Sequence, residues 1–354
     1  MSVDVDPAAG GTRSLDRRIT DAAPIRRWPM SVVPRDAFFW VRVAAMSGYA
    51  VAYVWWTRDK GVIIDRISVA LSVAVFLLCA FIGKPWRRWA MLVVDALLYA
   101  LMWFTYDMTR GAADGLGFPL QVEAPRNIDR FLFLGTDPNV WMQQHLYEPR
   151  SIRWYDYVMS TTYYTHFVFP IVAIAVLWAA SRVQWVRFMK RFATLMFCAC
   201  VMFVVMPTVP PWMASSQKFP YRIVPPLARH TGRGFRDLGF TGFVENWQSA
   251  LDWSNAVAAM PSLHSAYALI VPAFFLPWIR WRWLKVLVLA FPVLMLTSLV
   301  YFGEHWVIDG LVGWALVGAS FWFWDRVERR QRERRAGMAH EALRRLQVPQ
   351  LATS

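Results

Sequence analysis

The chain has 354 residues, of which 57% are hydrophobic and only 18% are charged. Soluble chains contain roughly 45–50% apolar and about 25% charged residues, so this much apolar surface exceeds what one water-soluble fold can bury. The composition excludes a disordered chain, a coiled coil and a disulfide scaffold, and it indicates an all-α polytopic membrane protein. The net charge is +14, but the positive residues lie between apolar runs, so we expect no nucleic-acid partner.

Eight stretches are long and apolar enough to be transmembrane helices, since a spanning helix needs about 20 mostly apolar residues. They are residues 37–56, 63–83, 90–106, 158–180, 192–209, 257–279, 286–303 and 305–324. The residues before the first stretch are polar, and the stretch itself is long enough to stay in the bilayer. We therefore expect no cleavable signal peptide.

The distribution of positive charge predicts the orientation of these helices. With an even number of spans and the N-terminus inside, the inner segments hold 24 Lys and Arg residues and the outer segments hold 13. Because cytoplasmic loops carry the excess of Lys and Arg, we expect both termini in the cytoplasm. The predicted cytoplasmic tails are residues 1–36 and 325–354, both basic. Arg outnumbers Lys, which together with the short loops favours the plasma membrane of a bacterial cell.

Two long segments are expected on the outer side, residues 107–157 and 210–256. Within the first, residues 128–146 mix aromatic and charged side chains. This mixture is typical of an element that lies half-inserted in the membrane interface.

Two short motifs carry the residues best suited to chemistry. One is AAMPSLHSAYALI, which contains His264, and the other is YFGEHWVIDGLVG, which contains His305 and Asp309. Both motifs fall at the outer membrane face in the predicted topology. Two histidines from separate helices are thus expected to meet at one depth.

The residue types in these motifs suit a phosphoryl group. His305 and Asp309 are four residues apart and share a helix face, so the carboxylate can hold one imidazole nitrogen and leave the other as a nucleophile or base. Pro261 suits the first turn of a helix, where Ser262 and the unpaired N–H groups offer an anion site. His264 lies beside that site and is placed to carry protons.

Other interpretations of the same residues are open at this stage. Either histidine alone is also explained as an interfacial polar anchor. The side chains of His264, His305, Asp309 and Glu304 could ligate zinc, although the sequence has no HExxH motif.

The two motifs resemble the second and third motifs of the type-2 phosphatidic acid phosphatase superfamily. The branch that they most resemble is the inositol phosphorylceramide synthase-like one, with the sphingomyelin synthases as neighbours. PSLH in place of PSGH, the YFGEHWVID sequence and the PTVPPW stretch of Pro207 to Trp212 carry this resemblance. The segment from Trp154 to Pro170 is also similar to an earlier conserved region of the family.

The resemblance implies a six-helix phosphatase-like catalytic bundle, which corresponds to residues 84–324, with the two helices of 37–83 as an addition. It also implies a metal-independent mechanism without a cofactor. His305 would attack phosphorus, Asp309 would orient it, and His264 would protonate the departing alcohol and then deprotonate the incoming one.

One departure from the family pattern concerns the phosphate-binding cation. Phosphatases carry Ser-Arg before the third-motif histidine, and this chain has Ser298 and Leu299 there. The first phosphatase motif has no match either. The candidates for a replacement cation are Lys218, Arg222, Arg150 and Arg153, among which we favour Arg222.

Three further polar residues are expected to support the site. His166 lies within the fourth predicted span, where an unpaired imidazole is costly, so it has either a structural hydrogen bond or a contact with the catalytic residues. Asp156, at the outer end of that span, is expected to pair with an Arg or a polyol hydroxyl. Glu304 directly precedes His305.

The sequence therefore predicts a membrane lipid phosphotransferase whose partners are a phospholipid donor and a lipid or glycolipid acceptor. The transferred group is a phospho-headgroup, for which phosphoinositol is one candidate. A lipid phosphate or polyprenyl diphosphate phosphatase is the alternative, because water is a competent acceptor for a phosphohistidine. A lipid transporter and a glycosyltransferase with Asp129 or Asp137 as base are weaker alternatives, since neither explains the paired histidines.

Overall fold

The structure is a computed structural model of the chain. It describes residues 37–60, 66–111, 115–217, 222–252 and 257–347. The predicted basic segment 1–36 lies outside the described residues.

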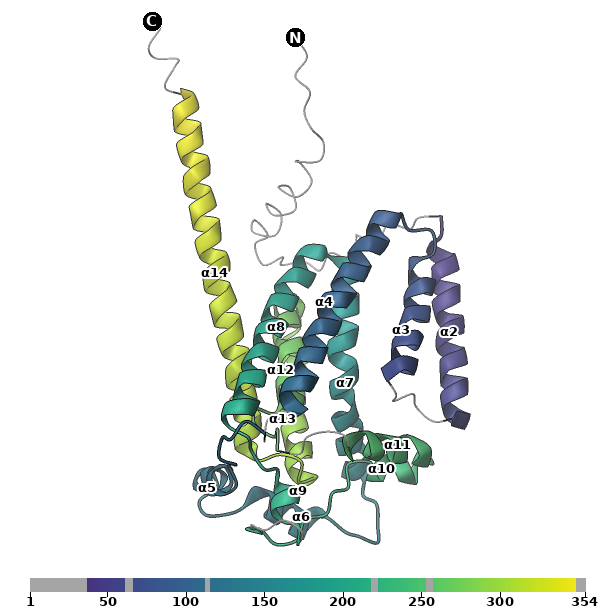
Figure 1. Ribbon diagram of the computed structural model, residues 1–354, viewed down its shortest axis with the longest axis vertical. Helices are drawn as coiled ribbons and strands as arrows, with labels where there is room; N and C mark the ends of the chain where they lie inside the picture. The colour runs from purple at the N-terminus through teal and green to yellow at the C-terminus, as the bar shows by residue number, and fades with distance from the viewer. Residues whose placement is uncertain (1–36, 61–65, 112–114, 218–221, 253–256, 348–354) are drawn as a thin grey trace, which may run out of the picture.

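The described part of the chain is all-α, as the composition predicted, and its only β-type pairings are isolated bridges. Long helices form one bundle, and short helices cover one end of it (Figure 1). The long helices are α2 (Phe39–Lys60), α3 (Arg66–Phe81), α4 (Trp86–Gly111), α7 (Trp154–Ala180), α8 (Arg182–Val205), α12 (Leu263–Phe275), α13 (Arg282–Tyr301) and α14 (Val307–Gln347). The shorter helices are α5 (Glu123–Leu132), α6 (Pro138–Leu146), α9 (Pro211–Ala214), α10 (Arg233–Asp237), α11 (Thr241–Asp252) and the 3₁₀ turn η2 (Leu276–Trp278).

Each of the eight apolar stretches coincides with one long helix. Within the described residues, four helices are long and apolar enough to cross a membrane, namely α4, α8, α13 and α14. Helix α7 is a fifth if its two halves, which are bent by 47°, count as one span. The expected total of eight spans therefore stays a prediction, because α2, α3 and α12 do not meet that test on their own.

Three helix boundaries differ from the sequence-based ones for identifiable reasons. Helix α8 begins at Arg182, because the Ser181 side chain accepts the Gln184 N–H at 3.4 Å and caps it, so the basic segment expected as a loop is helical. Helix α12 begins only after Ser262. Helix α14 continues without a break beyond residue 324, where the eighth stretch was expected to end.

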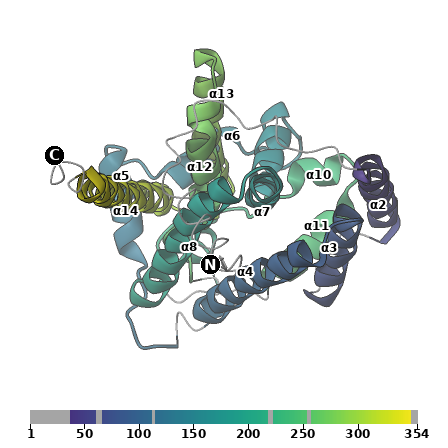
Figure 2. The same cartoon turned by 90° about the horizontal axis from the view of Figure 1, so that it is seen from above.

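Helix α7 lies in the middle of the bundle and packs against α8, α12 and α13, while α14 packs against α8 and α12 and α4 packs against α8. Helices α2 and α3 pack on each other at the edge of the molecule (Figures 1 and 2). Helices α4, α7, α8, α12, α13 and α14 thus form one packed group, and the division of the chain at residue 84 stays a prediction. The core of this group is rich in aromatic side chains from α8 and α12, including Phe188, Phe192 and Phe274.

Two glycines allow α14 to approach its neighbours closely. A Cβ atom at Gly313 would lie 2.6 Å from the Ser262 carbonyl oxygen, and one at Gly310 would lie 2.4 Å from the Leu296 side chain. Any side chain at position 313 would push α14 away from α12, because the obstacle there is backbone, and one at position 310 would require the Leu296 side chain to move. The close packing brings the beginnings of α12 and α14 together.

The bend in α7 has a local cause. Pro170 lies inside the helix and cannot donate a hydrogen bond to the carbonyl of His166, four residues earlier, and its ring also crowds that carbonyl. The bend falls between His166 and Val168. It therefore occurs at the histidine that the sequence marked as unusual.

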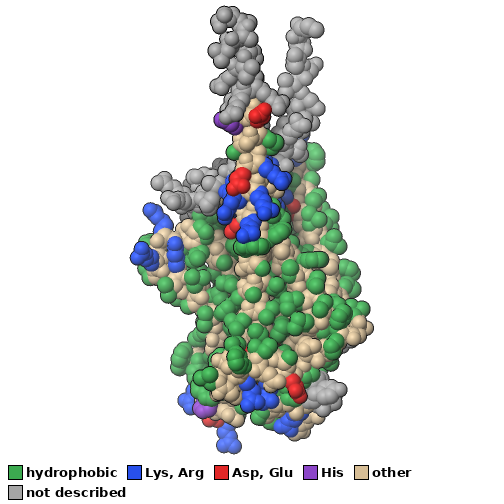
Figure 3. Space-filling model, turned by 90° about the vertical axis from the view of Figure 1, so that its left-hand side faces the viewer, with side chains coloured by type: hydrophobic (Ala, Val, Ile, Leu, Met, Phe, Trp, Pro, Cys, Tyr) green, Lys and Arg blue, Asp and Glu red, His purple; other side chains and the backbone are tan. Residues whose placement is uncertain are grey.

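The surface of the molecule is divided into zones (Figure 3). A broad belt of hydrophobic side chains covers the middle, and charged side chains gather above and below it. Helix α4 contributes many exposed apolar residues to this surface, among them Leu97, Leu101 and Phe104. Such a belt is costly in water and suits a lipid environment.

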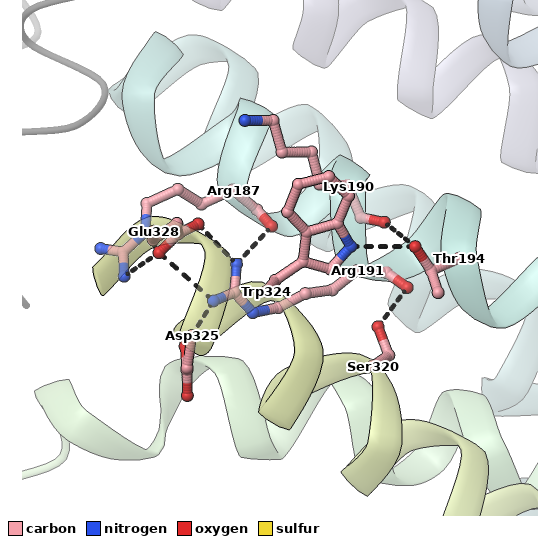
Figure 4. A network of polar contacts seen from close by, with 8 residues as sticks. All are labelled: Arg187, Lys190, Arg191, Thr194, Ser320, Trp324, Asp325 and Glu328. Atoms are coloured by element: carbon pink, nitrogen blue, oxygen red, sulfur yellow. Dashed lines mark hydrogen bonds and ion pairs between the residues drawn. The ribbon is translucent and has the colours of Figure 1, made fainter. Parts of the chain in front are cut away.

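A network of charged side chains joins α8 to α14 at the end of the bundle opposite the short helices (Figure 4). The Arg191 guanidinium, which is 2% exposed, contacts Glu328 at 3.1 Å and Asp325 at 2.6 Å. Arg187 contacts the same Glu328 at 2.9 Å, and the Ser320 hydroxyl donates to the Arg191 carbonyl at 2.9 Å. These contacts fix the position of α14 along its length.

We predict that Arg191→Met lowers the thermal unfolding midpoint strongly, because it leaves the buried Glu328 with one fewer cation. Breaking a buried ion pair costs about 3–5 kcal/mol, and the remaining Arg187 contact favours the lower end of that range. The matched control is Asp325→Asn, whose carboxylate is 55% exposed and is expected to contribute less than about 1 kcal/mol. Equal shifts of the two variants in detergent solution would contradict this account.

Candidate active site

The two motif histidines and Asp309 form one continuous line of contacts. The Nδ1 atom of His305 lies 3.3 Å from Oδ2 of Asp309, and its Nε2 atom lies 3.3 Å from Nδ1 of His264. His264 comes from the first turn of α12, His305 from the turn between α13 and α14, and Asp309 from the first turn of α14. Asp309 is fully buried and His305 is 7% exposed. The predicted meeting of these three residues is what the structure shows.

The turn that carries His305 is held by side chains from other elements. The Asn139 amide of α6 donates to the carbonyls of Val300 and His305, at 2.9 and 3.1 Å. The Trp306 indole donates to the Val209 carbonyl at 2.8 Å, and the Trp306 N–H donates to Oδ2 of Asp309 at 3.0 Å. Asp309 thus contacts both the imidazole and the backbone of the same turn.

The PTVPPW stretch lies beside this turn. The Trp212 N–H donates to the Gly303 carbonyl at 2.9 Å, and Thr208 forms backbone bridges with Gln121 and Ala258. The stretch therefore supports the α13–α14 turn through its backbone.

Asp129 of α5 caps the first turn of α14. Its two carboxylate oxygens accept the N–H groups of Val307 and Ile308, at 2.7 and 2.9 Å. Burial raises the pKa of Asp129 to about 7, although the two backbone hydrogen bonds oppose this shift. Asp137 caps α6 through the Val140 N–H and pairs with Arg126. Both carboxylates suggested as glycosyltransferase bases are therefore engaged in holding helices, which counts against that alternative.

The beginning of α12 differs in detail from the sequence-based expectation. Pro261 precedes the helix and is not in its first turn, because Ser262 is the N-cap residue. The Ser262 hydroxyl accepts the Ser265 N–H at 3.4 Å, and the Ser262 N–H donates to the Asp309 carbonyl at 2.9 Å. Ser262 is fully buried, and its backbone connects the start of α12 to α14.

Aromatic rings surround His264. The Tyr163 ring stacks on it with centroids 5.3 Å apart, and the His166 ring lies 3.9 Å away, centroid to centroid. His166 is 4% exposed, and its Nδ1 atom contacts the Tyr163 carbonyl of the preceding turn. His166 thus has both features that the sequence left as alternatives, a structural hydrogen bond and a contact with the site.

Arg229 is the cation that the sequence analysis did not single out. Its Nε and Nη2 atoms donate to the two carboxylate oxygens of Glu304, at 2.7 and 3.1 Å, and its guanidinium lies 4.4 Å from the centre of the Trp212 ring. Gln143 of α6 holds Ala228, the residue before Arg229, because its side chain donates to the Ala228 carbonyl and accepts the Ala228 N–H. Arg229 is therefore held next to the neighbour of His305.

The cations proposed from the sequence lie elsewhere. Arg150, Arg153 and Arg222 are exposed on the surface, whereas His305 is buried. Lys218 lies outside the described residues. The sequence gives one signal in this region, which is that the polar residues Asn139 and Gln143 are four positions apart on one helix face. This spacing does not indicate that Arg229 is the arginine that lies near them.

A second polar cluster lies at the start of α7. Asp156 accepts from the Tyr301 hydroxyl at 2.7 Å and from the Arg153 N–H at 2.8 Å, and it lies 3.8 Å from Arg233. The predicted pairing of Asp156 with an arginine is present, and the partner is Arg233. The nearby His230 is buried, which lowers its pKa to about 4.

Among the described residues, no group of three or more His, Cys, Asp or Glu side chains is arranged to hold a metal ion. Glu304, which the zinc interpretation would use as a ligand, is paired with Arg229.

The comparisons with known proteins identify the family of this chain. The family model described as the PAP2 superfamily matches residues 127–323, which is more than half of the chain. The chain therefore belongs to the PAP2 superfamily, a family of lipid phosphotransferases and phosphatases.

A more particular likeness is to the phosphoinositol dihydroceramide synthase of Bacteroides thetaiotaomicron. The two chains are 26% identical over 264 residues, which is 72% of this chain and 84% of that protein. This similarity supports the inositol phosphorylceramide synthase-like assignment made from the motifs. No solved structure matches the chain.

We predict a specific pH dependence of stability from Asp129. Because its pKa is raised in the folded state, the folded protein binds this proton more tightly than the unfolded chain does. The resulting stabilisation is fully present below about pH 4 and is lost as the pH rises through about 7. The thermal unfolding midpoint of the unmodified protein should therefore fall more between pH 5 and pH 8 than that of Asp129→Asn, which is less stable overall because its amide group opposes one N–H. Parallel pH profiles of the two proteins would contradict the assignment.

Proposed function

We propose that this protein is a membrane lipid phosphotransferase that works through a phosphohistidine on His305. The observation that carries the proposal is the line of contacts from Asp309 through His305 to His264. In the tautomer that this line favours, Nδ1–H of His305 donates to the Asp309 carboxylate, and the lone pair of Nε2 faces the site. An orienting carboxylate (Asp309), a nucleophile (His305) and a proton carrier (His264) then lie next to one another in space.

In the first half-reaction, Nε2 of His305 attacks the phosphorus of the donor lipid. The bond between phosphorus and the lipid alcohol oxygen breaks, and His264 gives its proton to that oxygen. Asp309 stabilises the positive charge that develops on His305. The donor alcohol leaves, and the phospho-headgroup remains on His305.

In the second half-reaction, His264 takes the proton of the acceptor hydroxyl. The acceptor oxygen attacks phosphorus, and the bond to Nε2 of His305 breaks. Atoms and charges balance without a metal or a further cofactor, so we propose a metal-independent reaction. A water molecule in place of the acceptor would give the phosphatase reaction.

Negative charge on the phosphoryl group requires a cation, and we propose Arg229 for this role ahead of Arg222, Lys218 and Arg153. Arg229 is anchored by Glu304, the chain neighbour of His305, and by Trp212. A guanidinium fixed in this way needs little reorganisation when the charge develops. Ser262 is the N-cap of the helix that carries His264, and we propose that it completes the phosphate environment with the first turn of α12.

The named relative supports a proposal for the donor and the acceptor. We propose phosphoinositol as the transferred group and a ceramide-like lipid hydroxyl as the acceptor, because the similarity to the Bacteroides protein covers 72% of this chain. We propose that residues 84–324 form the catalytic unit and that α2 and α3 are an addition to it. We also propose that the site faces away from the cytoplasm of a bacterial cell, because the described basic segments, residues 84–89, 181–191, 280–285 and 325–347, lie toward the opposite end of the bundle (Figure 1).

The central test follows the headgroup phosphate in lipid nanodiscs with a chelator present. Phosphatidylinositol labelled at phosphorus is supplied together with ceramide, and label should reach a second lipid. His305→Ala should reduce this transfer to background, and His264→Ala should reduce it by about 10²–10⁴-fold. The matched control is His145→Ala, an exposed histidine on α6.

Three outcomes of this assay would count against parts of the proposal. Normal transfer by His305→Ala would exclude the phosphohistidine. When a labelled lipid phosphate replaces phosphatidylinositol, release of labelled inorganic phosphate without transfer would make the protein a phosphatase. Loss of activity with the chelator, restored by a metal, would exclude the metal-independent reaction.

A second prediction concerns the cation. Arg229→Ala should lower kcat by about 10²–10³-fold, the usual cost of removing one donor from a developing oxyanion, and Arg229→Lys should restore part of it. Arg222→Ala is the competing variant, because the sequence alone favoured that residue. A larger loss with Arg222→Ala than with Arg229→Ala would reverse the choice.

A further inference from the structure

Helix α5 and the turn after it expose a cluster of large apolar side chains. Phe131 is 82% exposed and Leu134 is 96% exposed, and Leu132 and Phe133 between them are each nearly half exposed. We call residues 131–134 the apolar tip. Fully burying side chains of this kind stabilises a protein by about 1.5–3 kcal/mol each, so leaving four of them in water is unfavourable.

The backbone of the apolar tip shows that Leu134 is placed there at a cost. Helix α5 ends in a Schellman motif, in which the Gly135 N–H donates to the Arg130 carbonyl at 2.6 Å and the Leu134 N–H to the Phe131 carbonyl at 3.4 Å. The residue in the left-handed position of this motif is usually glycine, and here it is Leu134, with a φ of +52°. A leucine in this conformation costs roughly 1–2 kcal/mol. Its side chain gains no burial within the protein in return.

The position of α5 suits a membrane surface. The helix lies at the end of the bundle that carries the histidines, and it runs across the direction of α14 rather than along it (Figures 1 and 2). Helices that lie in the membrane interface have this orientation relative to spanning helices.

The charges around the apolar tip suit phospholipid headgroups. Arg130 is exposed, and its Nε atom donates to the Gly135 carbonyl at 3.1 Å, so it stays beside the tip. Asn127, Arg130, Phe131, Leu134 and Gly135 together line a shallow hollow. An apolar surface bordered by a cation and an amide matches an acyl chain below a phosphate group.

The opposite face of α5 reaches the catalytic helix. Asp129 is fully buried and accepts the N–H groups of Val307 and Ile308, which directly follow the His305–Trp306 turn. Helix α5 therefore connects the exposed apolar tip at its end with the first turn of α14.

We propose that the apolar tip inserts into the lipid leaflet at the site end of the bundle, and that this insertion holds α5 in place so that Asp129 can cap α14. The occupant of the surface is phospholipid, not a second copy of the chain or another protein. This inference stands on α5 itself and is independent of the reaction proposed above.

The test places a nitroxide spin label at Leu134→Cys in the full chain, in a background where Cys79, Cys198 and Cys200 are replaced by Ala. The protein is reconstituted in bilayers of phosphatidylcholine and phosphatidylglycerol. The label should be accessible to oxygen, which concentrates in the bilayer, and protected from an aqueous nickel chelate. A label at Gln144→Cys, an exposed polar position on α6, should show the reverse.

Two results would overturn the lipid contact. A Leu134 label that the nickel chelate reaches as readily as it reaches the Gln144 label would place the tip in water. Protection from both oxygen and the nickel chelate would show that protein, and not lipid, covers the tip.

A second variant tests the connection to the catalytic helix without relying on activity. Phe131→Ser combined with Leu134→Gly removes the apolar tip and relieves the backbone strain, so the fold itself should not suffer. In bilayers, amide hydrogen exchange at Val307 and Ile308 should become at least about tenfold faster than in the unmodified protein. Unchanged exchange at these two amides would show that lipid insertion does not hold Asp129 in place.

Discussion

The site depends on the hydrogen bonds that fix the turn between α13 and α14. His305 lies in this turn, and its backbone and side chain are held by Asp309 from one side, Asn139 from another and Val209 through the Trp306 indole. A buried turn of this kind would otherwise leave carbonyl and N–H groups without partners, which costs about 1–3 kcal/mol for each group. Helix α6, the loop before α9 and the first turn of α14 supply those partners. Their role is to make a buried, ordered turn possible in a region where the chain reverses direction.

Two carboxylates at this end of the molecule have different partners. Asp309 contacts the imidazole of His305, whereas Glu304, the residue before His305, is paired with Arg229. The carboxylate of Glu304 thereby keeps one arginine near the histidines without a spanning helix having to carry an arginine in its apolar part. Under the role proposed for Arg229, the phosphate-binding cation comes from a loop, which gives a physical reason why Leu299 can occupy the position where the phosphatase pattern has an arginine.

Composition and periodicity predicted the long helices well, because a run of about 20 apolar residues has few alternatives to a helix in a membrane. They misplaced the start of α8, since polar residues such as Arg187 and Arg191 look like a loop until their partners on α14 are known. For the site, motif spacing was sufficient to bring His264, His305 and Asp309 together. It could not identify Arg229 or the role of Asp129, because both depend on loops and short helices whose contacts are more than 70 residues away in the sequence. No local pattern encodes such pairings.

Gly313 has a consequence for how far this sequence can vary. The Ser262 carbonyl lies where a Cβ atom of any other residue would be, so the beginnings of α12 and α14 are in direct backbone contact. Even an alanine would have to move the two helices apart by roughly 1 Å to restore an ordinary van der Waals distance. The 3.3 Å contact between His264 and His305 would not survive a separation of that size. The distance between the two imidazole rings therefore depends on the absence of a methyl group at Gly313, two helical turns away from His305. Gly313 has no reactive group, yet it determines the geometry of the histidine pair.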